Sequence, residues 1–282
     1  MHTTFKFNHP TFNIDAPMTN QKMLTRNIII QTLVDALEPL EYVYAFWEGG
    51  AAAFNRIDEW SDIDLYSVVD NEKVDEAFSI TEKVLQKLSL IKQKYEVRHP
   101  ESSGLFQAFY KLEDASEYLI IDLAILTLNN PEKFLEPEIH GKAAFYLNKS
   151  NLQPPPLDKN AFAKKLQKKL EKLQAKFDMF NNFTQKEINR GNYLEAIDLY
   201  HNLTLATLVE ALRIKYNPTH YDFKTRYIHY ELPPEIVERL KHLYFVNDEK
   251  DLQEKYHEAA EWFSEIRLEI NFKETSRLIR ML

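Results

Sequence analysis

The sequence predicts an α+β protein in which a mixed β-sheet with helices is followed by an all-α helical bundle. In the first half, short apolar runs typical of strands lie among stretches of helical periodicity. A Gln-Pro-Pro-Pro run at 153–156 then interrupts the pattern, and almost every later stretch has helical spacing. We therefore expect two domains, at residues 1–150 and 157–282.

The first domain is expected to contain one helix, two strands, a second helix and three further strands. Apolar residues three or four apart predict a helix between Gln21 and Leu40, stopped by Pro39. An aromatic and β-branched run predicts a strand over 42–47. The later elements are a strand around 63–69, a helix around 74–88, and strands over 95–99, 105–111 and 118–126.

The second domain is expected to form four helices with short connections, an arrangement that favours a bundle. Prolines and candidate capping residues mark the ends of these helices. The expected boundaries are Asp158 to Gly191, a second helix ending before Pro218, a third starting around Pro233-Pro234, and a fourth from about Asp248 to Arg280.

The composition limits the possible classes of function. Acidic residues number 43 against 35 Lys plus Arg, whereas proteins that grip a nucleic-acid backbone usually show the opposite balance, so we expect no nucleic-acid partner. The chain has 0 cysteines, which excludes disulfides, thiolate metal sites and a cysteine nucleophile. The sequence contains neither a signal-peptide pattern nor a membrane-length apolar stretch, so we expect a cytoplasmic protein without a membrane partner.

Two acidic residues, Asp62 and Asp64, give the first signal of chemistry. Side chains alternate along a strand, so both carboxylates are expected on one face while Ile63 and Leu65 turn to the core. Two carboxylates this close repel each other unless a cation lies between them. Mg²⁺ suits the arrangement, because it takes one or two protein carboxylates and completes its shell with water and phosphates. The pair therefore predicts half of a magnesium site.

The only Gly-Gly pair of the chain, Gly49-Gly50, precedes these acids and leads into a turn of small residues at 51–53. Such a turn leaves backbone N–H groups available and lets a phosphate approach closely. The pair ends the strand expected to neighbour that of Asp62. We therefore expect phosphates and metal to meet at this point.

A third carboxylate, Asp122, lies at the centre of the apolar run 118–126. An acid in such a strand is costly without a cation or a hydrogen-bonding partner. A third carboxylate is also what a two-metal site needs as a bridge, or what an attacking hydroxyl needs as a proton acceptor. We therefore assign Asp122 to the same site.

These three elements together resemble the DNA polymerase β-like nucleotidyltransferase superfamily. Its pattern is a Gly-Gly or Gly-Ser pair, a gap of about this size, an Asp-x-Asp strand and a later Asp in a separate strand. Here the matching residues are Gly49-Gly50, Asp62-Ile-Asp64 and Asp122, within residues 20–128. Arg56 and Ser61 stand where many members have similar residues.

The resemblance implies a magnesium-dependent transfer of a nucleoside monophosphate to a hydroxyl of a small-molecule acceptor. Two Mg²⁺ ions would be held by Asp62, Asp64 and Asp122, and the nucleoside triphosphate, ATP or another, by Gly49, Gly50, Arg56 and Ser61. A helical domain after the sheet is similar in layout to the aminoglycoside and lincosamide nucleotidyltransferases, which transfer AMP from ATP to a drug. That narrower likeness rests on domain order, size and the helix start at 190–196.

One residue departs from the family pattern: Glu48 precedes the first glycine, where an apolar or aromatic residue is usual. A carboxylate there would bind a metal-linked water, repel the triphosphate or serve only the structure, and the structural role is the better expectation. Asp58 is also expected to be structural. For Arg56, contact with phosphate and simple exposure in a turn are equally compatible with the sequence.

Other readings of the chain stay open at this point. Glu195 and Glu210 would be general-base candidates, although a solvated helix face explains each better. Lys224 and Arg226 would either clamp a triphosphate or be ordinary loop cations. The whole chain would otherwise be a catalytically silent nucleotide-binding module, or an enzyme that nucleotidylates a protein, RNA or second nucleotide. The sequence leaves open the acceptor, the nucleotide and the oligomeric state.

Overall fold

The computed structural model describes residues 23–100 and 103–270. Contacts within the chain divide it into two compact units. The first unit takes in the described residues up to Leu135 together with His140–Gln153. The second takes in Glu136–Ile139 and the described residues from Pro154 onward. The first unit contains a sheet with helices and the second is helical, so the chain has the expected α+β fold.

The first unit is built on one mixed six-stranded sheet with the strand order β3-β4-β5-β2-β1-β6. Strands β2 and β5 run parallel, and the other neighbouring pairs are antiparallel. The strands span Val43–Glu48 (β1), Ile63–Val69 (β2), Ile91–Val97 (β3), Leu105–Leu112 (β4), Ile121–Thr127 (β5) and Ala144–Asn148 (β6). The strands that carry Asp64 and Asp122 are therefore direct neighbours near the middle of the sheet.

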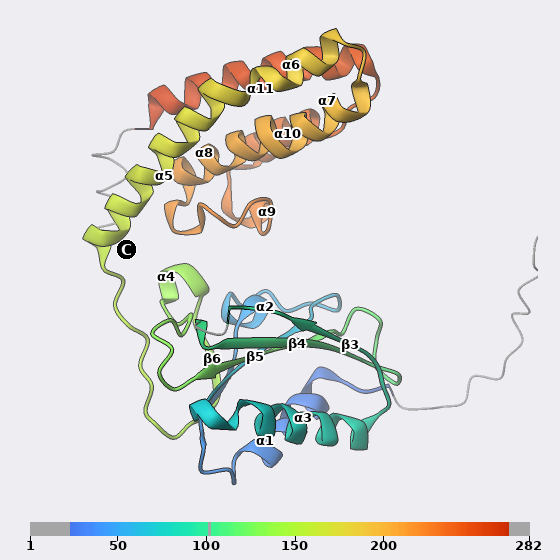
Figure 1. The fold of residues 1–282 in the computed structure, drawn as a ribbon, viewed down its shortest axis with the longest axis vertical. Helices are drawn as coiled ribbons and strands as arrows, with labels where there is room; N and C mark the ends of the chain where they lie inside the picture. The colour runs from blue at the N-terminus through green and yellow to red at the C-terminus, as the bar shows by residue number, and fades with distance from the viewer. Residues whose placement is uncertain (1–22, 101–102, 271–282) are drawn as a thin grey trace, which may run out of the picture. The chain divides into compact units, whose positions relative to one another are not determined.

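Two helices cover one face of this sheet, α1 at Arg26–Leu37 and α3 at Val74–Leu88 (Figure 1). Thr25 caps α1 through its hydroxyl, and the helix ends shortly before Pro39, as expected. Their apolar faces pack on alternate residues of the strands and form the main core of the unit. Its members include Ile29, Ile30, Leu33, Leu37, Ile63, Leu65, Ala77, Leu85, Ile121, Leu123 and Ile125.

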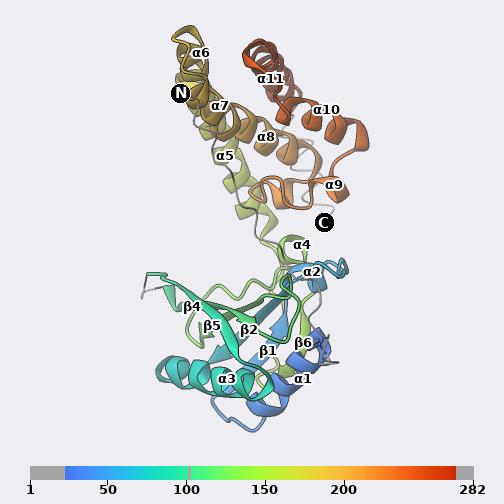
Figure 2. The ribbon, with the colours of Figure 1, turned by 90° about the vertical axis from the view of Figure 1, so that its right-hand side faces the viewer.

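The opposite face of the sheet carries the residues of interest. Side chains alternate along a strand, so Asp64 and Asp122 point away from the core that holds Ile63 and Ile121. A short helix, α2 at Gly50–Ala53, joins β1 to β2 and lies on this side of the sheet (Figures 1 and 2). A smaller apolar cluster lies beside it, formed by Ala45, Trp47, Val68, Leu126 and Leu135.

Two strands differ from the sequence-based expectation. The expected strand at 95–99 lies at Ile91–Val97, and β6 was not expected at all. Both are edge strands, and β3 is exposed along most of its length. An edge strand buries too few side chains to impose apolar alternation on its sequence, which explains why the pattern misses it.

The second unit is a group of helices with its own core. A π-helical turn at Tyr200–Leu205 joins two of the helices. The core includes Leu166, Leu170, Tyr200, Leu208, Leu212, Leu240, Trp262 and Phe263. The helices are α5 Lys159–Phe180, α6 Asn182–Asn189, α7 Tyr193–Leu199, α8 Ala206–Tyr216, α9 Ile228–Glu231, α10 Pro234–Tyr244 and α11 Glu249–Glu269; a further short helix, α4 at Pro137–His140, begins in the segment grouped with this unit.

The first helix of this unit was expected to run to Gly191, and the structure corrects that expectation. Asp158 caps α5 as expected, but the helix ends at Phe180 and α6 begins at Asn182. The buried Asn181 between them bonds to other helices: its carbonyl accepts from the Tyr256 hydroxyl at 3.2 Å. Asn181 itself keeps helical dihedrals and donates its N–H to the Phe177 carbonyl at 3.0 Å, so the interruption is confined to one residue. The expected extension of the last helix to Arg280 lies outside the described residues.

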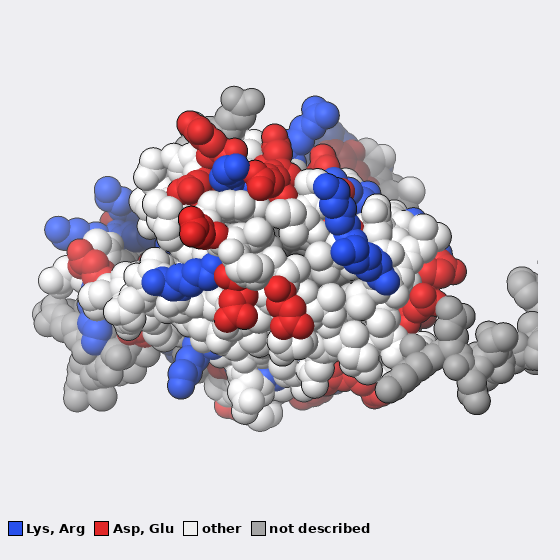
Figure 3. Space-filling view, turned by 90° about the horizontal axis from the view of Figure 1, so that it is seen from below, with Lys and Arg blue, Asp and Glu red and all other residues white. Residues whose placement is uncertain are grey.

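The described helices can be tested for membrane spans, and one face of the molecule for its distribution of charge. None of the described helices is both long and apolar enough to cross a bilayer. On the face seen from below, the described acidic and basic side chains are interspersed (Figure 3). This face therefore offers no uniform positive field along which a nucleic-acid backbone could lie.

Candidate active site

Asp64 and Asp122 stand directly opposite each other on the two parallel strands. The register of β2 and β5 pairs one with the other, so both side chains point to the same face of the sheet. Neighbouring strands are about 4.8 Å apart, which makes the two carboxylates neighbours. Asp62 is exposed just before β2, and its charge acts on Asp122. The structure thus pairs Asp64 with Asp122 where the parallel strands begin, and places Asp62 near enough for its charge to act on Asp122.

The Asp122 carboxylate is held by Gln107 on β4. The Gln107 side-chain Nε2 donates to Asp122 Oδ1 at 2.8 Å and to Oδ2 at 3.0 Å. Burial raises the pKa of Asp122 to about 6, the Gln107 hydrogen bonds lower it, and the negative charge of Asp62 raises it again. Burial therefore makes the ionised form of Asp122 less favourable than in water, and a bound cation would offset this free-energy cost.

His99 lies behind Gln107 in the same chain of hydrogen bonds. Its Nε2 is 3.2 Å from Gln107 Oε1. The amide nitrogen of Gln107 faces a carboxylate, so its oxygen must accept, and His99 Nε2 is then the donor. Sequence analysis singled out neither residue, because an isolated Gln and an isolated His in separate segments form no recognisable motif.

Gly50 makes close contact with Asp64. Its φ is +49°, and a Cβ built there would lie 1.6 Å from Asp64 Oδ2. A Cβ on Gly49 would lie 2.8 Å from a ring carbon of Tyr66, two residues further along β2. Packing therefore already requires the glycine pair, and the close fit holds the first turn of α2 against the Asp64 carboxylate.

Glu48 has a structural environment. It is 2% exposed, forms an ion pair with Arg26 of α1, and accepts a hydrogen bond at 2.6 Å from the Tyr146 hydroxyl of β6. These partners leave the carboxylate no need of a metal-linked water. Of the three expectations for Glu48, the structure favours the structural one.

Arg26 is a supporting residue that sequence analysis missed. Besides its ion pair with Glu48, its guanidinium donates to the backbone carbonyl of Asp62 and, at 3.4 Å, to that of Ser61. One side chain thus connects α1, the end of β1 and the backbone that presents Asp62. The sequence signal for it was weak, because an Arg on an expected surface helix is normally solvated.

The residues expected to bind nucleotide lie in the loop that leads to Asp62. The Ser61 hydroxyl donates to Asp58 Oδ1 at 2.7 Å and accepts from the Asp58 backbone N–H at 2.9 Å. Asp58 thus closes the turn, the structural role expected of it. Arg56 is partly buried, and its guanidinium lies 5.2 Å from the centre of the Phe54 ring. The structure places both nucleotide-binding candidates in this loop without testing their role.

Four further candidates lie in the second unit. Glu195 of α7 is exposed, and Glu210 of α8 forms an ion pair with Lys169 of α5. Lys224 and Arg226 are exposed in the loop after α8. Their backbone carbonyls accept hydrogen bonds from the fully buried guanidinium of Arg213, so this loop has a fixed shape. These positions are compatible with a solvated helix face for the two glutamates and with ordinary loop cations for Lys224 and Arg226.

The donor set fits Mg²⁺. Carboxylate oxygens are the ligands that this hard cation takes, and it usually binds one or two of them together with substrate phosphates. Asp64 and Asp122 are adjacent on one face, and burial, with a smaller contribution from the charge of Asp62, raises the pKa of Asp122, so its ionised form lacks the solvation that a bound cation would replace. Asp62, Asp64 and Asp122 are therefore the residues that would hold the metal.

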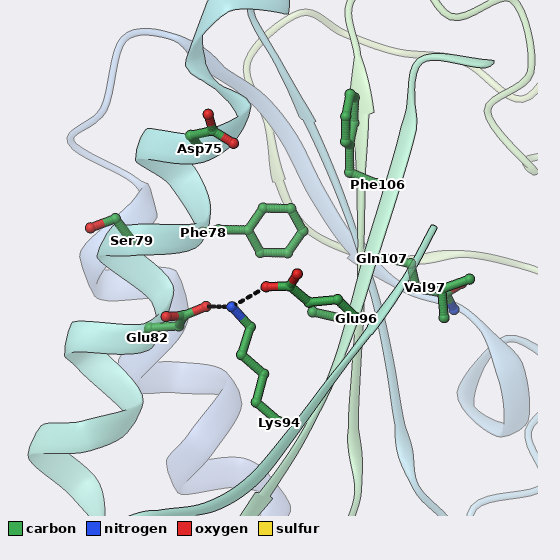
Figure 4. A pocket seen from close by; sticks show the side chains of 10 residues that line it. Asp75, Phe78, Ser79, Glu82, Lys94, Glu96, Val97, Phe106 and Gln107 are labelled. Atoms are coloured by element: carbon green, nitrogen blue, oxygen red, sulfur yellow. Dashed lines mark ion pairs between the residues drawn. The ribbon is translucent and has the colours of Figure 1, made fainter. Parts of the chain in front are cut away.

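A cavity of about 330 Å³ lies elsewhere, between α3 and strands β3 and β4 (Figure 4). Three of its charged residues are paired with one another, because Lys94 Nζ contacts Glu82 at 2.6 Å and Glu96 at 2.5 Å. Gln107 borders this cavity, but its side chain lies on the other side of the strands (Figure 4). The cavity thus opens on the helix-covered face, and the carboxylates lie on the opposite one.

The chain is only weakly similar to known proteins. No protein-family model and no curated protein sequence matches the chain. Among solved structures, an aminoglycoside 6-adenyltransferase from Bacillus subtilis is similar at a TM-score of 0.32 and 14% identity, covering 93% of this chain and 96% of that one. A STING-associated CdnE c-di-GMP synthase from Capnocytophaga granulosa is similar at 0.31 and 14%, covering 86% and 80%. Scores this low leave the chemistry to be argued from the residues themselves.

Proposed function

We propose that the protein is a magnesium-dependent nucleotidyltransferase that moves a nucleoside monophosphate, AMP from ATP, onto a hydroxyl of a small-molecule acceptor. The observation that carries this proposal is the register pairing of Asp64 with Asp122, with Asp62 beside them and Gly50 packed on Asp64. Two carboxylates on one face of neighbouring strands offer the oxygen ligands that Mg²⁺ takes together with substrate phosphates. Their position beside a glycine turn supports a site for a metal with a phosphate.

Asp62, Asp64 and Asp122 would hold the metal. Mg²⁺ bound there would neutralise charge on the transferred phosphate and favour in-line displacement. The acceptor hydroxyl oxygen would attack the α-phosphorus, the bond from that phosphorus to the bridging oxygen of the β-phosphate would break, and pyrophosphate would leave. Asp122 is the side chain that would accept the hydroxyl proton, since burial has already raised its proton affinity.

The turn at Gly49-Gly50 would bind the β- and γ-phosphates. The Gly49 N–H already donates to the Asp64 carbonyl at 2.9 Å, and the first bond of α2 runs from Ala53 N–H to the Gly49 carbonyl at 3.1 Å. The N–H groups of residues 50–52, which precede the intrahelical bonds, are therefore those that would face the phosphates. Small residues there allow close approach of an anion. Arg56 and Ser61, in the loop that follows, would contact the phosphates from the other side.

The rival reading as a catalytically silent module rested on Glu48. A carboxylate beside the phosphate turn would repel a triphosphate if it were exposed. Its burial with Arg26 and Tyr146 removes that objection. Nucleotidylation of a protein partner remains an alternative only in the choice of acceptor, because it would use the same three carboxylates.

Pyrophosphate release tests the proposal. Purified protein is incubated with Mg²⁺, one nucleoside triphosphate at a time, and an acceptor panel of aminoglycosides, lincosamides and a cell metabolite extract. We expect release that requires both metal and acceptor and is lost in Asp64→Asn. The matched control is Asp75→Asn, an exposed acid of α3 on the other side of the sheet, which should keep full activity. Equal turnover in Asp64→Asn and wild type would refute the assignment.

A further inference from the structure

Two aromatic side chains, Trp60 and Tyr118, form an exposed pair on the segments that lead into β2 and β5. Their ring centres are 4.9 Å apart with an angle of 82° between the planes, an edge-to-face arrangement. Trp60 is 60% exposed and Tyr118 is 48% exposed. Single exposed aromatic residues are normal on protein surfaces. A contacting pair from two segments that are far apart in sequence is a more specific feature.

Backbone hydrogen bonds order the loops that carry the two rings. The Trp60 backbone N–H donates to Asp58 Oδ1 at 3.0 Å, and Asp58 is in turn bonded to Ser61. The Tyr118 carbonyl accepts from Ile120 N–H at 2.9 Å in the turn before β5. Neither ring is on a loose segment, so a ligand that stacked on them would meet a preorganised surface and lose little entropy in ordering it.

The pair lies at the same end of the sheet as the acids. Trp60 precedes Asp62 by two residues, and Tyr118 precedes Asp122 by four. A chain extends at most about 3.6 Å per residue, so the two aromatic residues lie within roughly 7 and 14 Å of these acids along the backbone. A ligand with a phosphate at the carboxylates could therefore reach the rings with a flat group attached to it.

We propose that Trp60 and Tyr118 form a platform for the nucleobase of a nucleotide bound at the carboxylates, in which the base stacks on the face of one ring and the perpendicular second ring borders it. This inference rests on the proposed function. It adds a site for the base of the nucleotide to the site proposed for its phosphates. Stacking on an aromatic ring suits any base, because every base has a π-face. The base is also the only flat aromatic part of a nucleotide. The same chemistry serves the base of the triphosphate donor or that of a nucleotide acceptor.

Tryptophan fluorescence tests the platform without any turnover. The chain has 3 tryptophans, and Trp47 and Trp262 are 0% and 3% exposed, so acrylamide quenching reports almost entirely on Trp60. A non-hydrolysable ATP analogue with Mg²⁺ should shield Trp60 from acrylamide, whereas tripolyphosphate with Mg²⁺ should not. If tripolyphosphate must be supplemented with AMP or GMP before Trp60 is shielded, the base on the platform belongs to the acceptor.

Variants give the size of the effect. Trp60→Ala or Tyr118→Ala should weaken binding of the base-containing ligand by about 5- to 150-fold, the equivalent of about 1–3 kcal/mol at 1.4 kcal/mol per tenfold. Binding of tripolyphosphate should not change, and Trp60→Phe should restore most of the loss. Tyr95→Ala is the matched control, since Tyr95 is 64% exposed on the edge strand β3 and should have no effect.

The outcomes separate this inference from the function on which it rests. If the wild type binds the ATP analogue and Trp60→Ala together with Tyr118→Ala binds it equally well, the platform is refuted while nucleotide binding stands. If the wild type binds neither the analogue nor tripolyphosphate, both the function and the platform fall. If the analogue and tripolyphosphate shield Trp60 equally, the base does not lie on the rings and the platform is again refuted.

Discussion

Gln107 donates to both carboxylate oxygens of Asp122, at 2.8 and 3.0 Å, from a strand next to the one that carries the acid. Its own amide oxygen faces His99. The orientation of Asp122 is thus fixed from β4 and from the segment after β3, not by β5 alone. In a metal site, such outer partners aim the ligand and tune its basicity.

The first prediction concerns this support. Gln107→Leu should lower kcat by roughly 10- to 100-fold with little change in KM, because loss of an outer-shell partner misaligns a ligand without removing it. His99→Phe should have a smaller effect in the same direction, and Gln107→Asn should recover part of the loss. Gln93→Leu, at an exposed position of β3, is the control. A Gln107→Leu enzyme indistinguishable from that control would show that the hydrogen bonds are not used.

The second prediction concerns pH. Asp122 has its pKa raised from 3.8 to about 6 in the folded protein, so the fold binds this proton more tightly than the unfolded chain does. Stability contributed by the protonated form is present below pH 3.8 and is lost as pH rises through 6. Without metal, Asp122→Asn should therefore stabilise the protein at pH 7.5 but not at pH 3.5.

The expected gain in the free energy of unfolding is about 1–2 kcal/mol. This is less than the roughly 3 kcal/mol that corresponds to the full pKa shift, because the side chain is partly exposed and solvent screens its charge. Urea unfolding at both pH values measures it. With Mg²⁺ at pH 7.5 the wild type should become more stable than Asp122→Asn, because the ion binds the wild-type carboxylate more tightly than the variant's amide. Equal stability of the two proteins at both pH values would contradict the raised pKa.

The third prediction separates close contact from backbone strain. Gly50→Ala should lose most activity and more stability than Gly191→Ala, although both glycines have positive φ, at +49° and +74°. At Gly191 nothing lies within 4 Å of the added methyl group, so only the conformational cost of about 1–2 kcal/mol applies. At Gly50 the methyl group would displace the Asp64 carboxylate. Thermal unfolding and turnover of the two variants give the comparison, and equal losses would argue against the contact.

The fourth prediction concerns Arg26. Arg26→Met should destabilise the protein by about 2–4 kcal/mol, because it leaves Glu48 buried without its cation. It should also lower kcat, since the guanidinium holds the Asp62 carbonyl. Lys73→Met removes an exposed pair with Glu76 and should cost no more than about 1 kcal/mol. Chemical denaturation measures both, and a similar loss in the two variants would place Arg26 among ordinary surface cations.

The sequence predicted the central elements of the fold because burial imposes a pattern on them. Strands β2 and β5 lie near the middle of the sheet and are buried along most of their length, so they form apolar runs that the sequence shows clearly around Asp64 and Asp122. Edge strands β3 and β6 bury less and were misplaced or missed. The buried Asn181, at the one-residue interruption between α5 and α6, bonds to Tyr256, 75 positions later, and no local pattern can reveal such a bond.

The site divides in the same way. Asp62, Asp64, Asp122 and the glycine pair could be found because they follow one another at characteristic spacings. Gln107 and Arg26 could not, since their role comes only from register and tertiary contact. The glycine pair was expected for the sake of phosphates, and the structure adds a second reason, the contact of Gly50 with Asp64.

Calorimetric titration of a non-hydrolysable ATP analogue, with and without Mg²⁺, tests the central claim most directly. The wild type should bind the analogue only weakly without Mg²⁺ and much more tightly with it, and the double variant Asp62→Asn with Asp64→Asn should lose the metal-dependent part while unfolding at a temperature close to that of the wild type. Tight binding that is independent of Mg²⁺, or unchanged in the double variant, would contradict the account of these acids as the metal and nucleotide site.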